Sequence, residues 1–182
     1  MGVAKICEKG VVHDEVLYPL DVLIYATGFE WMATSTFNQV IGRHGQSLSE
    51  KWEEGGTRTF LGIHSEGFPN LFIVSGPQGG GGSFNFTDAI DQHGDYIVWM
   101  LKTLRSEKSN VVDVDFNAEV EYSEHCRIAD ERTRPLRDCI TYYNGHGEAK
   151  AGSLAYYGGG QWHKIRERAQ SSLSPFKFER KG

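Results

Sequence analysis

The 182 residues fit one ordinary domain, which at this length buries roughly two-thirds of the surface that the unfolded chain exposes. The formal net charge of -5 argues against general nucleic-acid binding, and the three cysteines and seven histidines lack CxxC or metal-ligand spacing, so we predict no disulfide framework and no metal. No apolar run approaches the roughly 20 residues that span a bilayer and no secretory signal opens the sequence, so we expect a cytoplasmic protein without membrane contact.

The N-terminal part of the sequence has the patterns of strands. Residues 1–20 are expected to form a short strand pair, with Gly10 and residues 13–15 as turn material. Residues 21–28 read Asp-Val-Leu-Ile-Tyr-Ala-Thr-Gly, an apolar run ending in small residues that is typical of a fully buried strand. The small residues would let another backbone or a cofactor approach closely, and a buried strand leading into a tight turn is the alternative. Residues 71–76 repeat this pattern. Two such strands predict a mostly parallel sheet whose carboxyl ends open into a cofactor-binding crevice.

A short helix is predicted after Ser47. Ser47 and Glu50 form a capping box, in which the hydroxyl and the carboxylate satisfy each other's free backbone donors at a helix start. We expect this helix to continue through Trp52 and to end at Gly55.

The longest predicted helix follows the glycine-rich stretch 78–82. Ser83, Asn85 or Thr87 is a suitable N-cap, and Asp88 in the first turn suits the positive end of the helix dipole. Its buried stripe is expected to consist of residues at three- and four-residue spacing: Ile90, His93, Ile97, Leu101 and Leu104.

Two more helices are predicted towards the C-terminus. The first covers about 117–133 and is followed by Pro135; the second covers 161–169. One face of the first carries its small or apolar residues: Ala118, Tyr122, Cys126 and Ala129.

Three motifs follow one another along the chain: Asp-Val-Leu-Ile-Tyr-Ala-Thr-Gly-Phe at 21–29, Gly-Phe-Pro-Asn-Leu-Phe at 67–72 and Gly76-Pro77. Their order and spacing resemble class I Baeyer-Villiger monooxygenases of the flavin-containing monooxygenase superfamily. Shorter matches lie at residues 41–43, 51–52, 57–62, 128–131, 143–145 and 157–159. The resemblance covers roughly residues 10–170 and is with the C-terminal portion only, and its specificity comes from order and spacing.

The resemblance implies an α/β fold that is part of a flavoprotein with two dinucleotide-binding domains. Residues 1–110 would be the C-terminal part of an incomplete, Rossmann-like FAD domain with a flavin-facing helix. Residues 111–182 would form a helical, loop-rich segment wrapping the active site. The complete enzyme would use FAD and NADPH to insert one oxygen atom of O2 next to a ketone carbonyl, giving an ester or a lactone.

The resemblance also assigns site residues. Those near the cofactor are Ala26, Thr27 and Gly28, at the linkage of the FAD domain, and Gly76, Pro77, Asn85, Phe86 and Thr87, near the flavin ring. The substrate-pocket residues are Gly81, Gly82, Ser83, Phe84 and Tyr142. A flexible linker is the alternative for the glycine run, and an aromatic core anchor is the alternative for Tyr142.

The sequence also lacks parts that this family needs. It has no Gly-x-Gly-x-x-Gly loop for either dinucleotide, and the active-site Asp and Arg of the family are missing. We therefore expect no catalytic residue in this chain, with that machinery lying upstream of residue 1. The isolated chain is expected to retain neither FAD nor NADPH and to need the missing N-terminal part of the enzyme as its partner.

Two other classes of function stay open. The chain is also compatible with a non-catalytic remnant that binds a partner polypeptide through uncovered sheet edges. A related N-hydroxylating flavoprotein monooxygenase is the other, because its Ala-Thr-Gly motif is similar.

Overall fold

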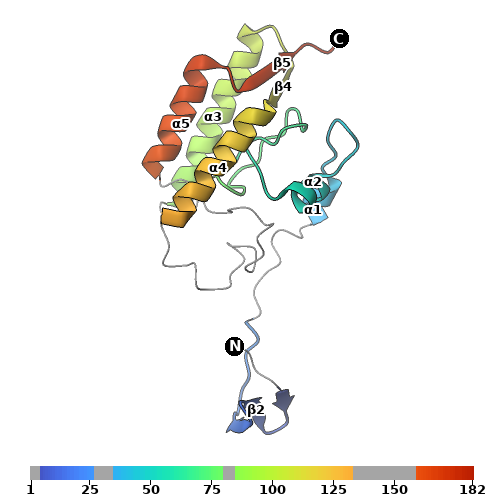
Figure 1. The fold of residues 1–182 in the computed structure, drawn as a ribbon, viewed down its shortest axis with the longest axis vertical. Helices are drawn as coiled ribbons and strands as arrows, with labels where there is room; N and C mark the ends of the chain where they lie inside the picture. The colour runs from blue at the N-terminus through green and yellow to red at the C-terminus, as the bar shows by residue number, and fades with distance from the viewer. Residues whose placement is uncertain (1–4, 27–34, 80–84, 133–158) are drawn as a thin grey trace.

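A computed structural model describes residues 5–26, 35–79, 85–132 and 159–182 (Figure 1). It is a mixed helix and strand structure. Its elements in chain order are β1 (Lys5–Cys7), β2 (Gly10–His13), β3 (Val16–Pro19), α1 (Ser35–Gln39), α2 (Leu48–Gly55), α3 (Phe86–Ser106), β4 (Val111–Val114), α4 (Phe116–Arg132), α5 (Gly159–Ser172) and β5 (Phe176–Glu179).

The N-terminal strands form a small antiparallel sheet in the order β1-β2-β3. It has three strands where the sequence predicted two, because Asp14 and Glu15 both adopt positive φ and turn the chain directly from β2 into β3. Gly10 is in β2 and not in a turn; a Cβ there would lie 2.0 Å from the carbonyl oxygen of Tyr18. Figure 1 shows this sheet apart from the helices.

The buried strand predicted at residues 21–28 is not found in its described part. Residues 21–26 contain no strand, and the side chains of Val22 and Ile24 are 73% and 83% exposed. Residues 71–76 contain no strand either, and Ile73 instead donates its backbone N–H to the carbonyl of Ile63. A buried parallel strand needs partners on both sides. Both sheets of the described residues are antiparallel, so the predicted parallel sheet is absent from that part of the chain.

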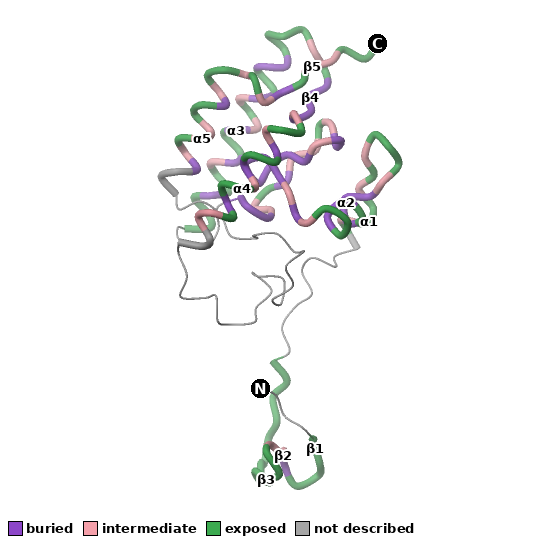
Figure 2. The backbone as a smooth tube through the Cα atoms, viewed as in Figure 1, coloured by how far each residue is buried: buried purple, intermediate pink, exposed green. Residues whose placement is uncertain are grey.

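The main hydrophobic cluster lies among α3, α4, α5 and the β4-β5 pair. Figure 2 shows its buried positions on the inward sides of these elements. It combines side chains far apart in sequence, among them Ile63, Met100, Val112, Cys126 and Trp162. Residues before and after position 110 contribute to this one core. The predicted division into a part of the FAD domain (1–110) and a C-terminal segment (111–182) stays a prediction.

The helix predictions are largely confirmed. The capping box of α2 is present in both directions, α4 buries Tyr122 and Cys126, and α5 extends beyond both predicted ends. Asn85 is the N-cap of α3, where its side chain accepts from the backbone N–H of Thr87. None of the helices in the described ranges is long and apolar enough to span a membrane.

The predicted buried stripe of α3 is partly wrong. His93 and Leu104 are buried, but Ile90 and Leu101 are 38% and 49% exposed. The buried face is rotated by about one residue, because Tyr96 and Met100 turn towards the core. A buried contact favours this rotation, because the Tyr96 hydroxyl pairs with His64 Nε2 at 2.9 Å in the core.

Candidate functional site

The residues predicted near a flavin ring, Gly76 and Pro77, lie in a turn over residues 75–79, here called the Gly-Pro turn. Its next residue, Gln78, has a φ of 62° and is only 1% exposed. The Gln78 Oε1 atom accepts from the backbone N–H and the hydroxyl of Thr59 at 3.0 and 2.9 Å. The Tyr122 hydroxyl on α4 donates to the Gln78 carbonyl at 2.6 Å. Buried hydrogen bonds therefore fix the backbone of this turn.

His93 on α3 holds the Gly-Pro turn from its other side. Its Nδ1 atom accepts from the backbone N–H of Ser75 at 3.1 Å, and its Nε2 atom donates to the carbonyl of Gly79 at 3.0 Å. Burial lowers the pKa of His93, so the ring is neutral at pH 7. Gly62 packs against the same turn, and a Cβ at residue 62 would lie 2.0 Å from the Cα of Gly79.

The N-terminus of α3 is exposed. The Asn85 Oδ1 atom accepts from the backbone N–H of Thr87 at 3.0 Å and from its hydroxyl at 2.6 Å. Phe86, the first residue of the helix, is 56% exposed. The described residues thus leave a capped helix N-terminus uncovered, with the positive end of its dipole accessible.

The structure brings some predicted site residues together and not others. Gly76 and Pro77 lie alongside α3, and Asn85 to Thr87 begin that helix. Ala26 ends the exposed segment 21–26, which Figure 1 shows away from the helices. The others lie outside the described residues: Thr27, Gly28, Gly81, Gly82, Ser83, Phe84 and Tyr142.

Sequence reasoning missed the side chains that hold the Gly-Pro turn. His93 was recognised only as a member of an apolar stripe, and its polar ring at a core position was the signal that a buried hydrogen bond was needed. Gln78 carried no such signal, because a Gln between a proline and a glycine run is typical of an exposed loop.

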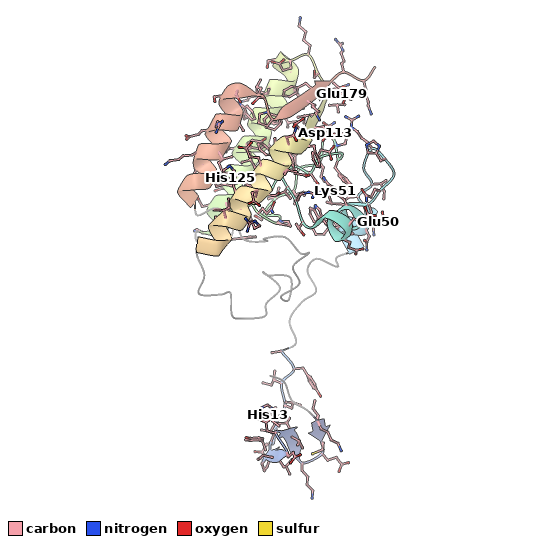
Figure 3. All side chains as sticks on the ribbon, in the orientation of Figure 1. His13, Glu50, Lys51, Asp113, His125 and Glu179 are labelled. Carbon is pink, nitrogen blue, oxygen red and sulfur yellow. The ribbon has the colours of Figure 1, made fainter. Side chains whose placement is uncertain are left out.

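A second polar cluster lies around α2 and α4, with Glu119 one helical turn before Tyr122 on α4. Glu119 is fully buried, and both its carboxylate oxygens accept from Lys51 Nζ at 3.0 Å. Arg43 donates to Asp113 at 3.1 Å and to Glu179 at 2.7 Å. Figure 3 shows Lys51, Asp113 and Glu179 in the same part of the molecule.

A cavity of about 290 Å³ opens beside this cluster, and its lining includes Arg43, Lys51, Arg58 and Glu66. Burial raises the pKa of Glu119, although Lys51 opposes that shift. The hydrogen bonds to Asp113 and Glu179 raise the pKa of Arg43. Because most of these charges pair with one another, we interpret the cluster as a structural network and not as the predicted cofactor site.

Comparisons with known proteins find monooxygenases both by sequence and by structure, although no protein-family profile matches the chain. It is 34% identical over 155 residues to the Baeyer-Villiger monooxygenase peniC of Penicillium patulum, over 80% of this chain and 25% of that protein. It is 30% identical over 181 residues to the phenazine N-monooxygenase PhzNO1 of Lysobacter antibioticus, over 96% of this chain and 32% of that protein.

Solved structures agree in fold. An oxidized steroid monooxygenase bound to NADP has a TM-score of 0.75 and 25% sequence identity, over 98% of this chain and 34% of that one. OTEMO in complex with FAD and NADP has a TM-score of 0.75 and 22% identity, over 97% of this chain and 34% of that one, and shows likeness of fold alone.

The mixed fold and these matches identify the chain as a homologue of one portion of flavoprotein monooxygenases. More narrowly, the chain is a homologue of Baeyer-Villiger monooxygenases and corresponds to their C-terminal portion. The resemblance stated from the sequence motifs is thereby confirmed. The chain spans about a quarter of the length of the Penicillium relative and about a third of the steroid monooxygenase.

Proposed function

We propose that this chain supplies the C-terminal part of a flavoprotein monooxygenase that inserts one oxygen atom of O2 next to a ketone carbonyl. The observation that carries the proposal is the uncovered N-terminus of α3, together with the rigid Gly-Pro turn that His93, eight residues after the N-cap, holds against the same helix. Pro77 to Gly79 are buried in this turn and Gly76 is partly exposed, so the uncovered helix N-terminus is the feature that favours binding of an anionic group. In this proposal the complete enzyme binds FAD and NADPH.

The described residues fit one end of an FAD molecule. When bound, the flavin supplies the oxygen-transfer chemistry. The first-turn N–H groups of α3, at Phe86 and Asp88, have no acceptor within the helix and can stabilise negative charge on the ring. Gly76 and Pro77 would contact the ring from the turn, without a side chain large enough to block it. Pyrophosphate binding is left to the partner, because this chain has no Gly-x-Gly-x-x-Gly loop.

The ketone pocket is assigned to the remaining predicted residues. Gly81, Gly82, Ser83 and Phe84 follow the Gly-Pro turn and precede α3, so they connect the two features that would contact the ring. Tyr142 is proposed as an aromatic wall of the same pocket. A run of glycines at this place favours a roomy pocket, because it supplies no side chains to fill it.

The partner of the chain is proposed to bind residues 5–26. This segment has apolar side chains that the described residues leave in solvent, including Leu17, Tyr18, Val22, Ile24 and Tyr25. An apolar surface of this kind on a strand-forming segment is typical of a region that another polypeptide covers. The occupant would be the dinucleotide-binding part of the monooxygenase.

Joining the chain to the matching N-terminal part of the Penicillium relative tests this proposal. With FAD, NADPH and a panel of ketones, the joined protein is expected to form esters or lactones. The N-terminal part alone is the control. The chain alone is expected to carry no flavin and to oxidise no NADPH, because it lacks the phosphate-binding loops. No product above the control, with both parts folded, would contradict the proposal.

A second candidate is oxygenation at nitrogen, favoured by the match with the phenazine N-monooxygenase over 96% of this chain. The same joined protein, given a phenazine, decides between the two. Formation of an N-oxide without any ester would favour the second candidate. A chain that binds its partner firmly while the pair has no activity on either substrate would instead identify a non-catalytic binding module.

A further inference from the structure

We propose that His93 is a positioning residue that holds the Gly-Pro turn in place for oxygen transfer. The inference rests on the proposed function, because the turn matters for the reaction only if it contacts the flavin. His93 itself reaches the turn only through backbone groups, at Ser75 and Gly79, and would act on the reaction through them.

The two hydrogen bonds of His93 span the turn. Ser75 precedes the Gly76-Pro77 pair and Gly79 follows it, so the imidazole fixes both ends of the segment that carries the proposed cofactor contacts. A carbonyl oxygen only accepts and a backbone N–H only donates, so Nε2 carries the proton and Nδ1 is bare. Only the neutral imidazole in this one tautomer makes both bonds.

The environment of His93 enforces that state. The residue is 1% exposed, and burial lowers its pKa. The ring of Trp162 from α5 lies 5.4 Å away at an interplanar angle of 34°. Arg166 on α5 adds a positive charge that also disfavours the imidazolium, and its guanidinium lies over Trp162 while donating to Gln92. The imidazole ring of His93 therefore packs between the Gly-Pro turn and α5.

Packing links the turn to His93 with little free space. A Cβ at residue 79 would lie 3.2 Å from the His93 Cε1 atom and 2.9 Å from the carbonyl oxygen of Gly76. An apolar ring at position 93 would fill the volume but leave the Ser75 N–H and the Gly79 carbonyl without their partners. The turn would then move to find others, and a shift of about 1 Å at a reacting group can cost about 100-fold in rate.

The first test uses the whole chain and needs no cofactor. Long-range nitrogen-proton NMR spectra are expected to show His93 as the neutral Nε2–H tautomer at pH 7, with Ser75 among the protected amides. In His93→Phe, Ser75 protection is expected to fall about tenfold. His93→Asn keeps an oxygen near the Nδ1 position and is expected to retain most of that protection. Tyr96→Phe is the matched control, because it removes a buried hydrogen bond from the same helix face without touching the turn.

The second test uses the joined enzyme. His93→Phe is expected to lower kcat about 10-fold to 100-fold with little change in KM, and His93→Asn to recover part of that loss. Tyr96→Phe should leave both constants near those of the parent. The Nδ1–H tautomer, unchanged Ser75 protection in His93→Phe, or unchanged kcat despite lost protection would each overturn the inference. If the parent joined enzyme is inactive, the proposed function fails, while the tautomer and exchange results still decide whether His93 holds the turn.

Discussion

The buried ion pair between Lys51 and Glu119 gives a quantitative test of how the fold is held. Glu119 is fully buried and accepts from Lys51, from the Ser65 hydroxyl at 3.2 Å and from the Glu66 backbone N–H at 2.9 Å. Lys51→Met removes the cation and leaves the carboxylate buried. The expected loss is about 3–5 kcal/mol of unfolding free energy. For a chain of this size that corresponds to a fall of roughly 6–20 °C in Tm.

The double variant Lys51→Met with Glu119→Gln separates charge from packing. The amide oxygen introduced by Glu119→Gln still accepts from Ser65 and Glu66 but carries no charge, so the double variant should regain at least half of the lost stability. The loss in Lys51→Met should also depend on pH. Because the folded pKa of Glu119 is raised, the folded state gains protons more readily than the unfolded state, and stability falls as pH rises through that pKa. The single variant should therefore suffer least under acidic conditions.

Urea unfolding at several pH values measures both effects. Equal stability of the single and double variants at pH 7 would refute the reasoning, because it would show that Glu119 bears no uncompensated charge. A loss in the single variant that is the same at all pH values would refute it as well.

Other predictions concern single positions and are checked by thermal or urea unfolding. Burial lowers the pKa of His64 from its ordinary 6.5 to about 3, so the unfolded chain takes up that proton first; stability should fall by roughly 2 kcal/mol between pH 6.5 and 4.5 from this residue, and the fall should be smaller by about that amount in His64→Phe. Gly62→Ala should cost more than about 2 kcal/mol because its Cβ would clash with Gly79, whereas Gly45→Ala, also at positive φ but in open space, should cost only about 1 kcal/mol. Equal costs for these two glycine substitutions would contradict the predicted clash at residue 62. Ser47→Ala should lower the free energy of unfolding by about 1 kcal/mol, because it removes the N-cap of α2.

The sequence predicted local features best. The capping box at Ser47 and the buried face of α4 depend on residues within a few positions of one another, and both are confirmed. The N-cap of α3 is Asn85, one of the three residues that the sequence allowed. The motif order also identified the family, which the comparisons confirm.

Long-range features were predicted less well. The run Val22 to Tyr25 has the composition of a central strand, but the described residues contain no neighbouring strand for it, so it is exposed. The contacts of Gln78 with Thr57 and Thr59, and those of His93 with the Gly-Pro turn, join segments 14 to 21 residues apart. No periodicity in the sequence reports such contacts, because they depend on tertiary packing.

In the proposed function this chain completes an FAD-binding monooxygenase. To test this, the chain is mixed with the separately purified N-terminal part of the Penicillium relative and flavin absorbance is followed through size exclusion. The prediction is one yellow complex containing both polypeptides, with less flavin retained when Ile24 and Tyr25 are changed to Ser. Two polypeptides that elute apart, with all flavin on the N-terminal part or none on either, would contradict the claim.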